Sequence, residues 1–340
     1  MIRIFVFHSF CTTFADNMEK KDLRIVFMGT PEFAVETLQK LVENEYNVVA
    51  VVTQPDKPVG RHQTEMQPSA VKQYAVQQGI PVLQPEKMKD PVFIEELRSY
   101  QANLQVVVAF RMLPEVVWAM PEYGTFNVHA ALLPQYRGAA PINWAVINGE
   151  TETGVTTFFL DHDIDTGRII MKKHFPIPDE ADVEYVYDGL MHLGADICIE
   201  TLEAIVAADG RPETTEQESV LDGSPIKPAP KIFKETCQID WTKTAKQVYD
   251  FVRGLSPYPG AWTTLVTPDG KETVMKVYKT QKTGRQAHAV GTISTEGKHL
   301  YISAGDELLE LVEVQLAGKK RMAAADFLNG MKQVAECRMR

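Results

Sequence analysis

Short apolar runs alternate with amphipathic stretches over the N-terminal half of the chain. Residues 23–29, 46–53 and 103–110 (LRIVFMG, YNVVAVVT and NLQVVVAF) have the length and composition of buried strands, and residues 30–44 carry apolar side chains at helical spacing. Strands that read as continuous apolar runs and alternate with helices are typical of parallel sheets covered on both faces. The sequence therefore predicts an α/β domain with a doubly wound, mostly parallel, Rossmann-like sheet.

The pattern changes after a helix predicted to end at Ala207. Residues 209–228 are polar, rich in Pro and Gly and without periodicity, which indicates a linker. A further helical stretch is then followed by short strands separated by turn signals, a pattern that favours a small OB-like β-barrel. These strand-like segments are 262–267, 272–280, 289–294, 299–304 and 308–315. We predict a catalytic domain over 18–208, a linker over 209–228 and a barrel domain over 229–340.

The first 17 residues are set apart from this pattern. Their apolar opening could imitate a secretory signal, but His8 and Ser9 interrupt it and no small-residue cleavage box follows. Met18 offers a second start, so we interpret residues 1–17 as an N-terminal extension and leave them out of the fold prediction. No apolar run elsewhere reaches the roughly 18 residues that span a membrane.

Cysteine spacing and charge narrow the possible functions. The four Cys lie far apart and form no CxxC or His-paired spacing, so the sequence predicts neither a metal site nor a disulfide framework, and the cytoplasm is the simplest location. The net charge of −10 is divided unevenly, since residues 1–224 carry −16 and residues 225–340 carry +6. Such asymmetry indicates a polyanion-facing module on an acidic body, and the alternative is a chance excess on a solvated surface.

Two polar residues come at the end of another predicted strand. Asn127 and His129 lie two apart in FNVHA, so their side chains project from the same strand face at its carboxyl end, where ligands of doubly wound sheets bind. A strand over 155–160 leads into an acidic loop that contains Asp165. A neutral His can accept a proton near pH 7, a carboxylate can orient it, and an Asn amide can donate to a developing oxyanion.

These three residue types together predict acyl transfer to an amine that has a proton to lose. The alternative is structural, with Asn127 and Asp165 capping loops and His129 buried with its hydrogen bonds satisfied, and the spacing alone does not decide between them. Other chemistries are disfavoured. The MGTPEF turn after the first strand has one glycine where a dinucleotide site needs G-x-G-x-x-G, and no GxxxxGK[ST] loop for ATP occurs.

The segment NVHAALLPQYRGAAPINWAVINGETETGVTTFFLDHDIDTG, residues 127–167, is similar to the signature of the folate-dependent formyltransferases. RIVFMGTPEFA and VVTQPDKPVGR narrow the likeness to the branch of that family that formylates methionyl-tRNA, and it extends from about Leu23 through KIFKETCQIDW into the barrel domain. In that family the Asn-x-His pair and the Asp before Thr-Gly are catalytic, which implies these roles for Asn127, His129 and Asp165, the last directly or through an ordered water.

The resemblance implies a reaction and its partners. A formyl group would pass from 10-formyltetrahydrofolate to the α-amine of methionine on initiator tRNA, giving N-formylmethionyl-tRNA for translation initiation without a metal. The family's folate-contacting Ser-Leu-Leu-Pro maps onto Ala131, Leu132, Leu133 and Pro134, where Ala131 lacks the hydroxyl. Arg137 is a candidate for contact with an anionic substrate group, and the alternative is a surface ion pair.

The resemblance also implies a tRNA-contacting loop, and it shows where this sequence differs from the family pattern. QPDKPVGRHQTEMQPSAVK matches the family's inserted loop at the acceptor end, so Lys57 and Arg61 are expected to neutralise phosphates. Further departures from the family pattern are Phe110 and Arg111 in place of Tyr-Gly, and Asp163 in place of a glycine. All three are expected at the rim of the folate pocket.

Other functions stay open at this point. A formyltransferase acting on the amine of a sugar nucleotide or purine precursor explains the three polar residues equally well, but does not need the Arg61 loop or the positive barrel. A non-catalytic tRNA-binding protein does not need an acid/base pair at a strand end. A hydrolase that releases the formyl group to water is chemically close.

Overall fold

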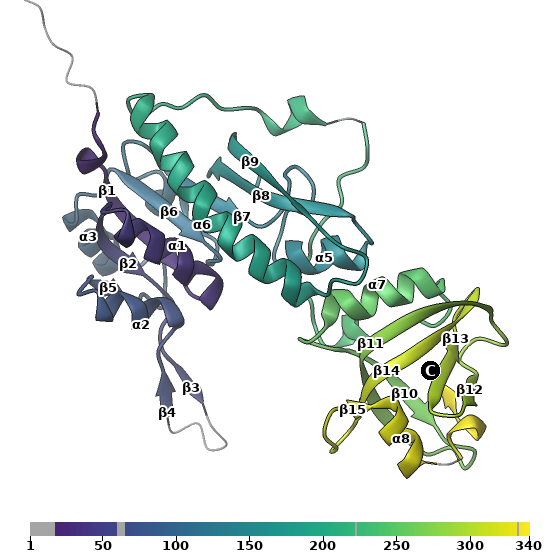
Figure 1. The fold of residues 1–340 in the computed structure, drawn as a ribbon. Coiled ribbons are helices and arrows are strands. Elements are labelled where there is room, and N and C mark those ends of the chain that lie inside the picture. Colours follow the sequence, from purple (N-terminus) through teal and green to yellow (C-terminus); the bar gives the residue numbers. More distant parts are fainter. Residues whose placement is uncertain (1–17, 60–64, 222, 332) are drawn as a thin grey trace, which may run out of the picture.

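The computed structural model describes residues 18–59, 65–221, 223–331 and 333–340, which form two domains joined by a long connection (Figure 1). The predicted extension over residues 1–17 and the loop residue Arg61 lie outside the described residues. Each domain has its own hydrophobic core, one built around a parallel sheet and the other inside an antiparallel sheet.

The N-terminal sheet confirms the predicted fold class. Its strand order is β5-β2-β1-β6-β7-β8-β9, with the first five strands parallel and the last two antiparallel to their neighbours. The strands are β1 (Arg24–Gly29), β2 (Asn47–Val52), β5 (Val82–Leu83), β6 (Leu104–Val108), β7 (Thr125–His129), β8 (Glu152–Phe159) and β9 (Ile169–Pro176).

Helices cover both faces of this sheet. Along β1, Ile25 and Phe27 pack on the side of α1 and α6, whereas Val26 and Met28 pack on the side of α3, which explains why the strand reads as a continuous apolar run. The helices are α1 (Glu32–Glu43), α2 (Ala70–Gln77), α3 (Pro91–Ser99), α4 (Glu115–Trp118), α5 (Pro141–Ile147) and α6 (Val183–Ala207). A 3-10 turn, η1 (Lys20–Asp22), precedes β1.

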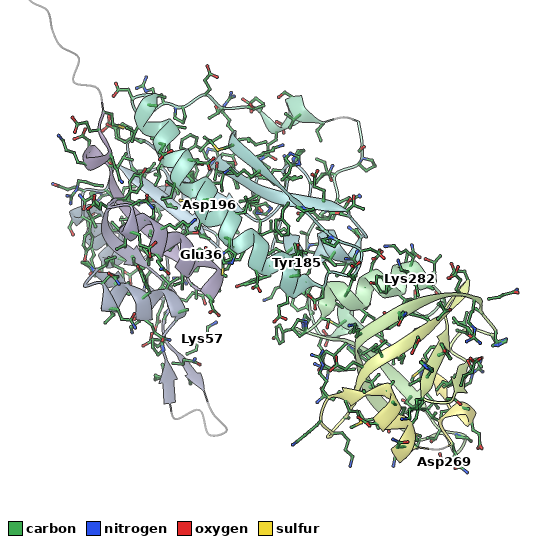
Figure 2. The ribbon with its side chains drawn as sticks, viewed as in Figure 1. Glu36, Lys57, Tyr185, Asp196, Asp269 and Lys282 are labelled. Atoms are coloured by element: carbon green, nitrogen blue, oxygen red, sulfur yellow. The ribbon has the colours of Figure 1, made fainter. Side chains whose placement is uncertain are left out.

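The long loop after β2 contains structure that the sequence pattern did not predict. β3 (Lys57–Val59) and β4 (Glu65–Gln67) pair antiparallel as a separate two-stranded ribbon. In Figure 1 this ribbon extends away from the body of the domain. The side chain of Lys57 is exposed on it, and Figure 2 labels that residue.

The C-terminal domain is a curled antiparallel sheet in the order β12-β13-β14-β11-β10-β16, with β15 beside β14. A bridge between Thr292 and Arg338 joins its two edges, as in a small barrel. The strands are β10 (Ala261–Val266), β11 (Glu272–Gln286), β12 (Ile293–Glu296), β13 (His299–Ser303), β14 (Glu307–Leu316), β15 (Met322–Ala323) and β16 (Arg338–Met339). Helices α7 (Ala245–Leu255) and α8 (Ala324–Gly330) pack on it, with short turns η3 (Glu235–Cys237) and η4 (Val334–Glu336).

The domains meet where α7 packs on α5 and on the start of α6. Asn143 in α5 donates to the backbone oxygen of Gly254 at 2.9 Å, and Arg253 donates to the backbone oxygen of Ala181 at 2.8 Å. The segment predicted as a linker runs back along the first domain, where Thr215 pairs with Ile169, and it includes the 3-10 turn η2 (Gln217–Val220). No helix in the described part of the chain is long and apolar enough to cross a membrane.

Candidate active site

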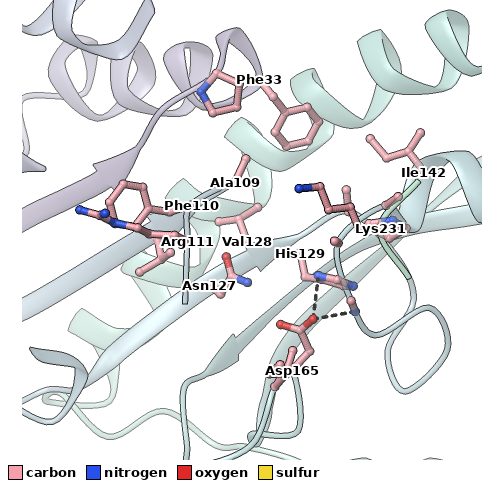
Figure 3. A pocket seen from close by; sticks show the side chains of 18 of the residues that line it. Phe33, Ala109, Phe110, Arg111, Asn127, Val128, His129, Ile142, Asp165 and Lys231 are labelled. Atoms are coloured by element: carbon pink, nitrogen blue, oxygen red, sulfur yellow. Dashed lines mark hydrogen bonds and ion pairs between the residues drawn. The ribbon is translucent and has the colours of Figure 1, made fainter. Parts of the chain in front are cut away.

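A cavity of about 1110 Å³ lies beyond the carboxyl end of β7, and both domains contribute to its wall. Asn127, His129 and Asp165 all line it (Figure 3). This position is expected, because ligands of doubly wound sheets bind beyond the carboxyl ends of the strands. Asn127 and His129 alternate with the core residue Val128 on β7, and this two-residue period turns both polar side chains to one side. The structure therefore brings together the three residues singled out from the sequence.

His129 is almost fully buried, with 5% of its surface exposed. A hydrogen bond to one backbone carbonyl fixes the tautomer of its ring. Its Nε2 lies 2.9 Å from the backbone oxygen of Tyr136. Because a carbonyl can only accept, Nε2 carries the proton, and in the neutral ring Nδ1 then holds the free lone pair. Nδ1 faces Asp165 Oδ2 at 3.8 Å, so a proton taken up there would be stabilised by the carboxylate.

Asp165 is held in an unusual backbone conformation. Its φ of 56° lies in the left-handed region, as does the φ of 62° at Tyr136. Non-glycine residues adopt this region at a cost and only when their surroundings enforce it. The Gly138 backbone N–H donates to Asp165 Oδ2 at 2.9 Å. A Cβ at Gly138 would lie 2.5 Å from the oxygen of Ala229, so only glycine fits there.

Gln217 is a part of the site that the sequence pattern did not predict. It lies in the supposed linker and is fully buried. Its amide nitrogen donates to the backbone oxygens of Asp165, at 2.9 Å, and Gly167, at 2.8 Å. Its amide oxygen accepts from Arg137 at 2.8 Å. Gln217 thus ties the loop of Asp165 to the loop that follows β7.

The same contacts give Arg137 a different place from the one expected. Its guanidinium binds Gln217 and lies 4.0 Å from Glu218, and Arg137 is not among the described residues that line the cavity. These contacts favour a structural role, and contact with an anionic substrate group stays a prediction. The residue supports the Asp165 loop, which sequence spacing could not reveal because its partner is 80 residues away.

The segment Ala131, Leu132, Leu133 and Pro134 is not among the described residues that line the cavity, although the preceding Ala130 lines it. Ala131 and Leu133 are fully buried, and Thr156 in β8 bridges their backbones by donating to Ala131 O and accepting from Leu133 N. The folate contact expected of this segment therefore stays a prediction. These backbone contacts fix the start of the loop that carries Tyr136.

The three departures from the family pattern do line the cavity. Phe110 contributes an aromatic wall, and the Arg111 guanidinium donates to the backbone oxygens of Pro85 and Glu86. Burial lowers the pKa of Arg111, and its Nε is buried without a partner in the described part of the chain. Asp163 is exposed, and its φ is not among the positive values, which explains why glycine is not required there.

The amide of Asn127 has no hydrogen-bond partner among the described residues, although it is half-buried at the cavity. An amide left free in this position can donate to an oxyanion of a bound substrate. The second domain adds Lys231, Pro257 and Tyr258 to the same cavity. Figure 3 shows the Lys231 side chain reaching over the site on the side opposite Asp165.

In the residues that the structure describes, no group of three or more His, Cys, Asp or Glu side chains is arranged to hold a metal ion. Cys198, Cys237 and Cys337 are free and buried. Of the two residues expected to contact tRNA, Lys57 lies on the exposed β3–β4 ribbon, outside the cavity. The contact expected of Arg61 stays a prediction.

Comparison with known proteins places the chain in a family. A family model described as "Formyl transferase" matches residues 23–202, and one described as "Formyl transferase, C-terminal domain" matches residues 231–332. A protein of Parabacteroides distasonis named methionyl-tRNA formyltransferase is 60% identical over 94% of this chain and 99% of its own. A protein of the same name from Porphyromonas gingivalis is 46% identical over 92% and 97%.

Solved structures share the fold. The crystal structure of the sugar 3N-formyl transferase WlaRD has a TM-score of 0.61 at 18% identity, over 88% of this chain and 99% of that one. HypX from Aquifex aeolicus, solved in complex with tetrahydrofolic acid, has a TM-score of 0.57 at 20% identity, over 90% of this chain and 47% of that one. The chain belongs to the formyl transferase family, among its methionyl-tRNA formyltransferases.

Proposed function

We propose that the protein transfers the formyl group of 10-formyltetrahydrofolate to the α-amine of methionyl-initiator tRNA, giving N-formylmethionyl-tRNA for translation initiation. The observation that carries the proposal is the convergence of Asn127, His129 and Asp165 on one cavity, in a chain that matches methionyl-tRNA formyltransferases along nearly its whole length. The folate is a co-substrate here and supplies the formyl carbon that the amine attacks.

The positions of the three side chains support a division of roles. The free Asn127 amide donates to the oxygen that becomes negative as the amine adds to the formyl carbon. The lone pair on His129 Nδ1 accepts a proton from the attacking amine and returns one to the folate nitrogen as the old carbon–nitrogen bond breaks. Asp165 Oδ2, at 3.8 Å from Nδ1, stabilises the charged ring.

The cavity has room for the reacting end of the folate and the aminoacyl end of the acceptor. Its volume of about 1110 Å³ exceeds that of most pockets for one small ligand, roughly 300–1,000 Å³. Val107, Leu113 and Trp118 form an apolar part of the wall, which suits a flat ring system. The Asn127 and His129 side chains form a polar part, where the reacting groups would meet.

A tRNA acceptor is favoured over a small amine by the second domain. The positive share of the charge lies here, since residues 225–340, which cover this domain and the end of the linker, have a net charge of +6. It also lines the cavity through Lys231, so an acceptor bound at the reacting centre would reach both domains. Neither feature is needed for the amine of a sugar nucleotide or a purine precursor.

The test is an acceptor comparison. The purified chain would be incubated with 10-formyltetrahydrofolate and either charged initiator tRNA, a sugar-nucleotide amine or a purine-precursor amine. We expect formylation of the methionyl-tRNA alone, measured as acid-stable N-formylmethionine after hydrolysis of the ester. Preferential formylation of either small amine, or release of formate without an acceptor, would overturn the proposal.

We further propose that the enzyme works in the cytoplasm. Its cysteines show no paired spacing along the sequence, and charged initiator tRNA is used where translation begins. Cell fractionation followed by the formylation assay would test this, and activity confined to a membrane or exported fraction would contradict it.

A further inference from the structure

The loop between α7 and β10 presents one aromatic ring at the cavity. Tyr258 lines the cavity while 82% of its surface is exposed, more than that of any other large apolar or aromatic side chain among the described residues. Its ring and hydroxyl have no hydrogen-bond or ring partner in the part of the chain that the structure describes. An exposed aromatic ring offers a ligand a large contact face of defined geometry.

The loop that carries the ring is firmly held. Prolines 257 and 259 flank Tyr258 and fix the backbone φ on both sides. Lys276 Nζ donates to the backbone oxygen of Pro259 at 2.8 Å, and Gly260 N donates to that of Leu255, also at 2.8 Å. A ligand that packs on Tyr258 therefore needs to order only the side chain, and not the loop.

The proposed acceptor brings a matching group to this place. The reacting amine belongs to an amino acid esterified to the last ribose of the tRNA, so the last nucleobase is only a few bonds from the amine. When the amine is at Asn127 and His129, that base must lie against another wall of the same cavity. Tyr258 supplies an aromatic face there, and Lys231, whose ammonium lies 5.4 Å from the Phe233 ring, supplies a cation to the same cavity from the same domain. Single-stranded nucleic-acid sites combine aromatic faces with cations.

We propose that Tyr258 is the stacking surface for the terminal nucleobase of the acceptor end. This subsite rests on the proposed function, because a small amine would bring no base to the ring. Its role is to bind the acceptor and to set the distance of the amine from His129, not to take part in proton transfer. The face of the ring matters for this role, and the hydroxyl does not.

The test compares Tyr258→Ala, Tyr258→Phe and Tyr258→Trp. Loss of the ring should raise the KM for methionyl-tRNA by about tenfold, as expected for one base stacked on an aromatic side chain. The KM for the formyl donor should stay within about twofold, and the Phe and Trp variants should bind the acceptor like the parent. A matched control is Tyr185→Ala, which removes another exposed Tyr that does not line the cavity (Figure 2).

A second acceptor makes the test specific for the base. With the parent enzyme, methionyl-tRNA with an abasic last nucleotide should show the same rise in KM. With Tyr258→Ala, loss of that base should raise the KM no further. An unchanged acceptor KM in Tyr258→Ala, a rise in the donor KM instead, or additive losses with the abasic acceptor would each overturn the subsite. A parent enzyme that does not formylate methionyl-tRNA would refute the proposed function itself, which is a different result.

Discussion

At the scale of single residues, the site depends on backbone groups as much as on side chains. The carbonyl of Tyr136 sets the tautomer of His129, and the N–H of Gly138 holds the Asp165 carboxylate. The hydroxyl of Tyr136 in turn donates to Glu150, and burial together with this hydrogen bond raises the pKa of Tyr136, so the hydroxyl stays protonated. Gln217 completes the arrangement by holding the carbonyl of Asp165.

This arrangement predicts that Gln217→Glu impairs catalysis. A carboxylate can still accept from Arg137, but it cannot donate to the oxygens of Asp165 and Gly167. Losing these buried contacts should lower kcat by about tenfold while the KM for both substrates changes little. Steady-state kinetics would measure this, beside thermal unfolding to show that the fold is kept.

The neighbouring Glu218 offers an isosteric control, since it is exposed and only 4.0 Å from Arg137. Glu218→Gln should leave kcat unchanged. A Gln217→Glu enzyme with the parent kcat would show that Asp165 does not need this support.

At the scale of elements, the contact between α5 and α7 joins the domains and so sets the shape of the cavity. The contact is close because Gly254 has no side chain: a Cβ there would lie 2.6 Å from Ile147 Cγ1 and 2.8 Å from its backbone N. The hydrogen bond from Asn143 to Gly254 and the one from Arg253 to Ala181 lie at this contact.

Gly254→Ala should therefore push the helices apart. We expect a loss of about 2 kcal/mol in the free energy of unfolding, because the Cβ meets backbone as well as side-chain atoms. Chemical denaturation would measure it. Gly330→Ala is the matched control, since Gly330 ends α8 and its added Cβ would meet nothing within 4 Å. If both variants are equally stable, the close approach at Gly254 has no energetic consequence.

The elements differ in how far the sequence predicted them. β1, β2 and β6 were predicted from their continuous apolar runs, and α6 ends at Ala207, as predicted. The edge strand β9, which is only partly buried, was not predicted. The position of Asn127 and His129 at the cavity was also predicted, because it depends only on their spacing of two residues at the carboxyl end of one strand. The β3–β4 ribbon was missed because its strands have three residues each, too few to show a pattern.

Contacts between distant residues were not predictable in the same way. Gln217 reaches Asp165 from 52 positions away, out of a segment whose composition indicates a linker. Tyr258 reaches the cavity from the other domain. The folate contact of segment 131–134 stays a prediction, because a match to a family motif names residues without saying whether side chains or backbone face the ligand.

At the scale of the whole molecule, the charge is arranged for a large anionic partner. The positive domain and the β3–β4 ribbon extend from the same side of the first domain in the view of Figure 1. Lys57 is exposed on the ribbon, and the body between them is acidic, since residues 1–224 carry −16. Phosphate contacts made by such cations release counterions from the nucleic acid. This release becomes less favourable as the salt concentration rises, so the contacts weaken.

Binding of methionyl-tRNA should accordingly weaken steeply with salt, whereas binding of the formyl donor should change little. Each phosphate contact adds about one unit to the slope of log affinity against log salt, so Lys57→Ala should reduce the slope by about one. Filter binding over a salt series would measure it, with Lys21→Ala on η1 as a control that leaves the slope unchanged. Acceptor binding that does not change with salt concentration would argue against a tRNA substrate.

The most direct test of the proposed chemistry is single-turnover formyl transfer by His129→Ala, with donor and methionyl-tRNA both saturating. Removing the group that takes the amine proton should slow the chemical step by about 100-fold or more, without weakening the binding of either substrate. A rate equal to that of the parent enzyme would mean that His129 is only a buried residue with satisfied hydrogen bonds, and that another group moves the proton.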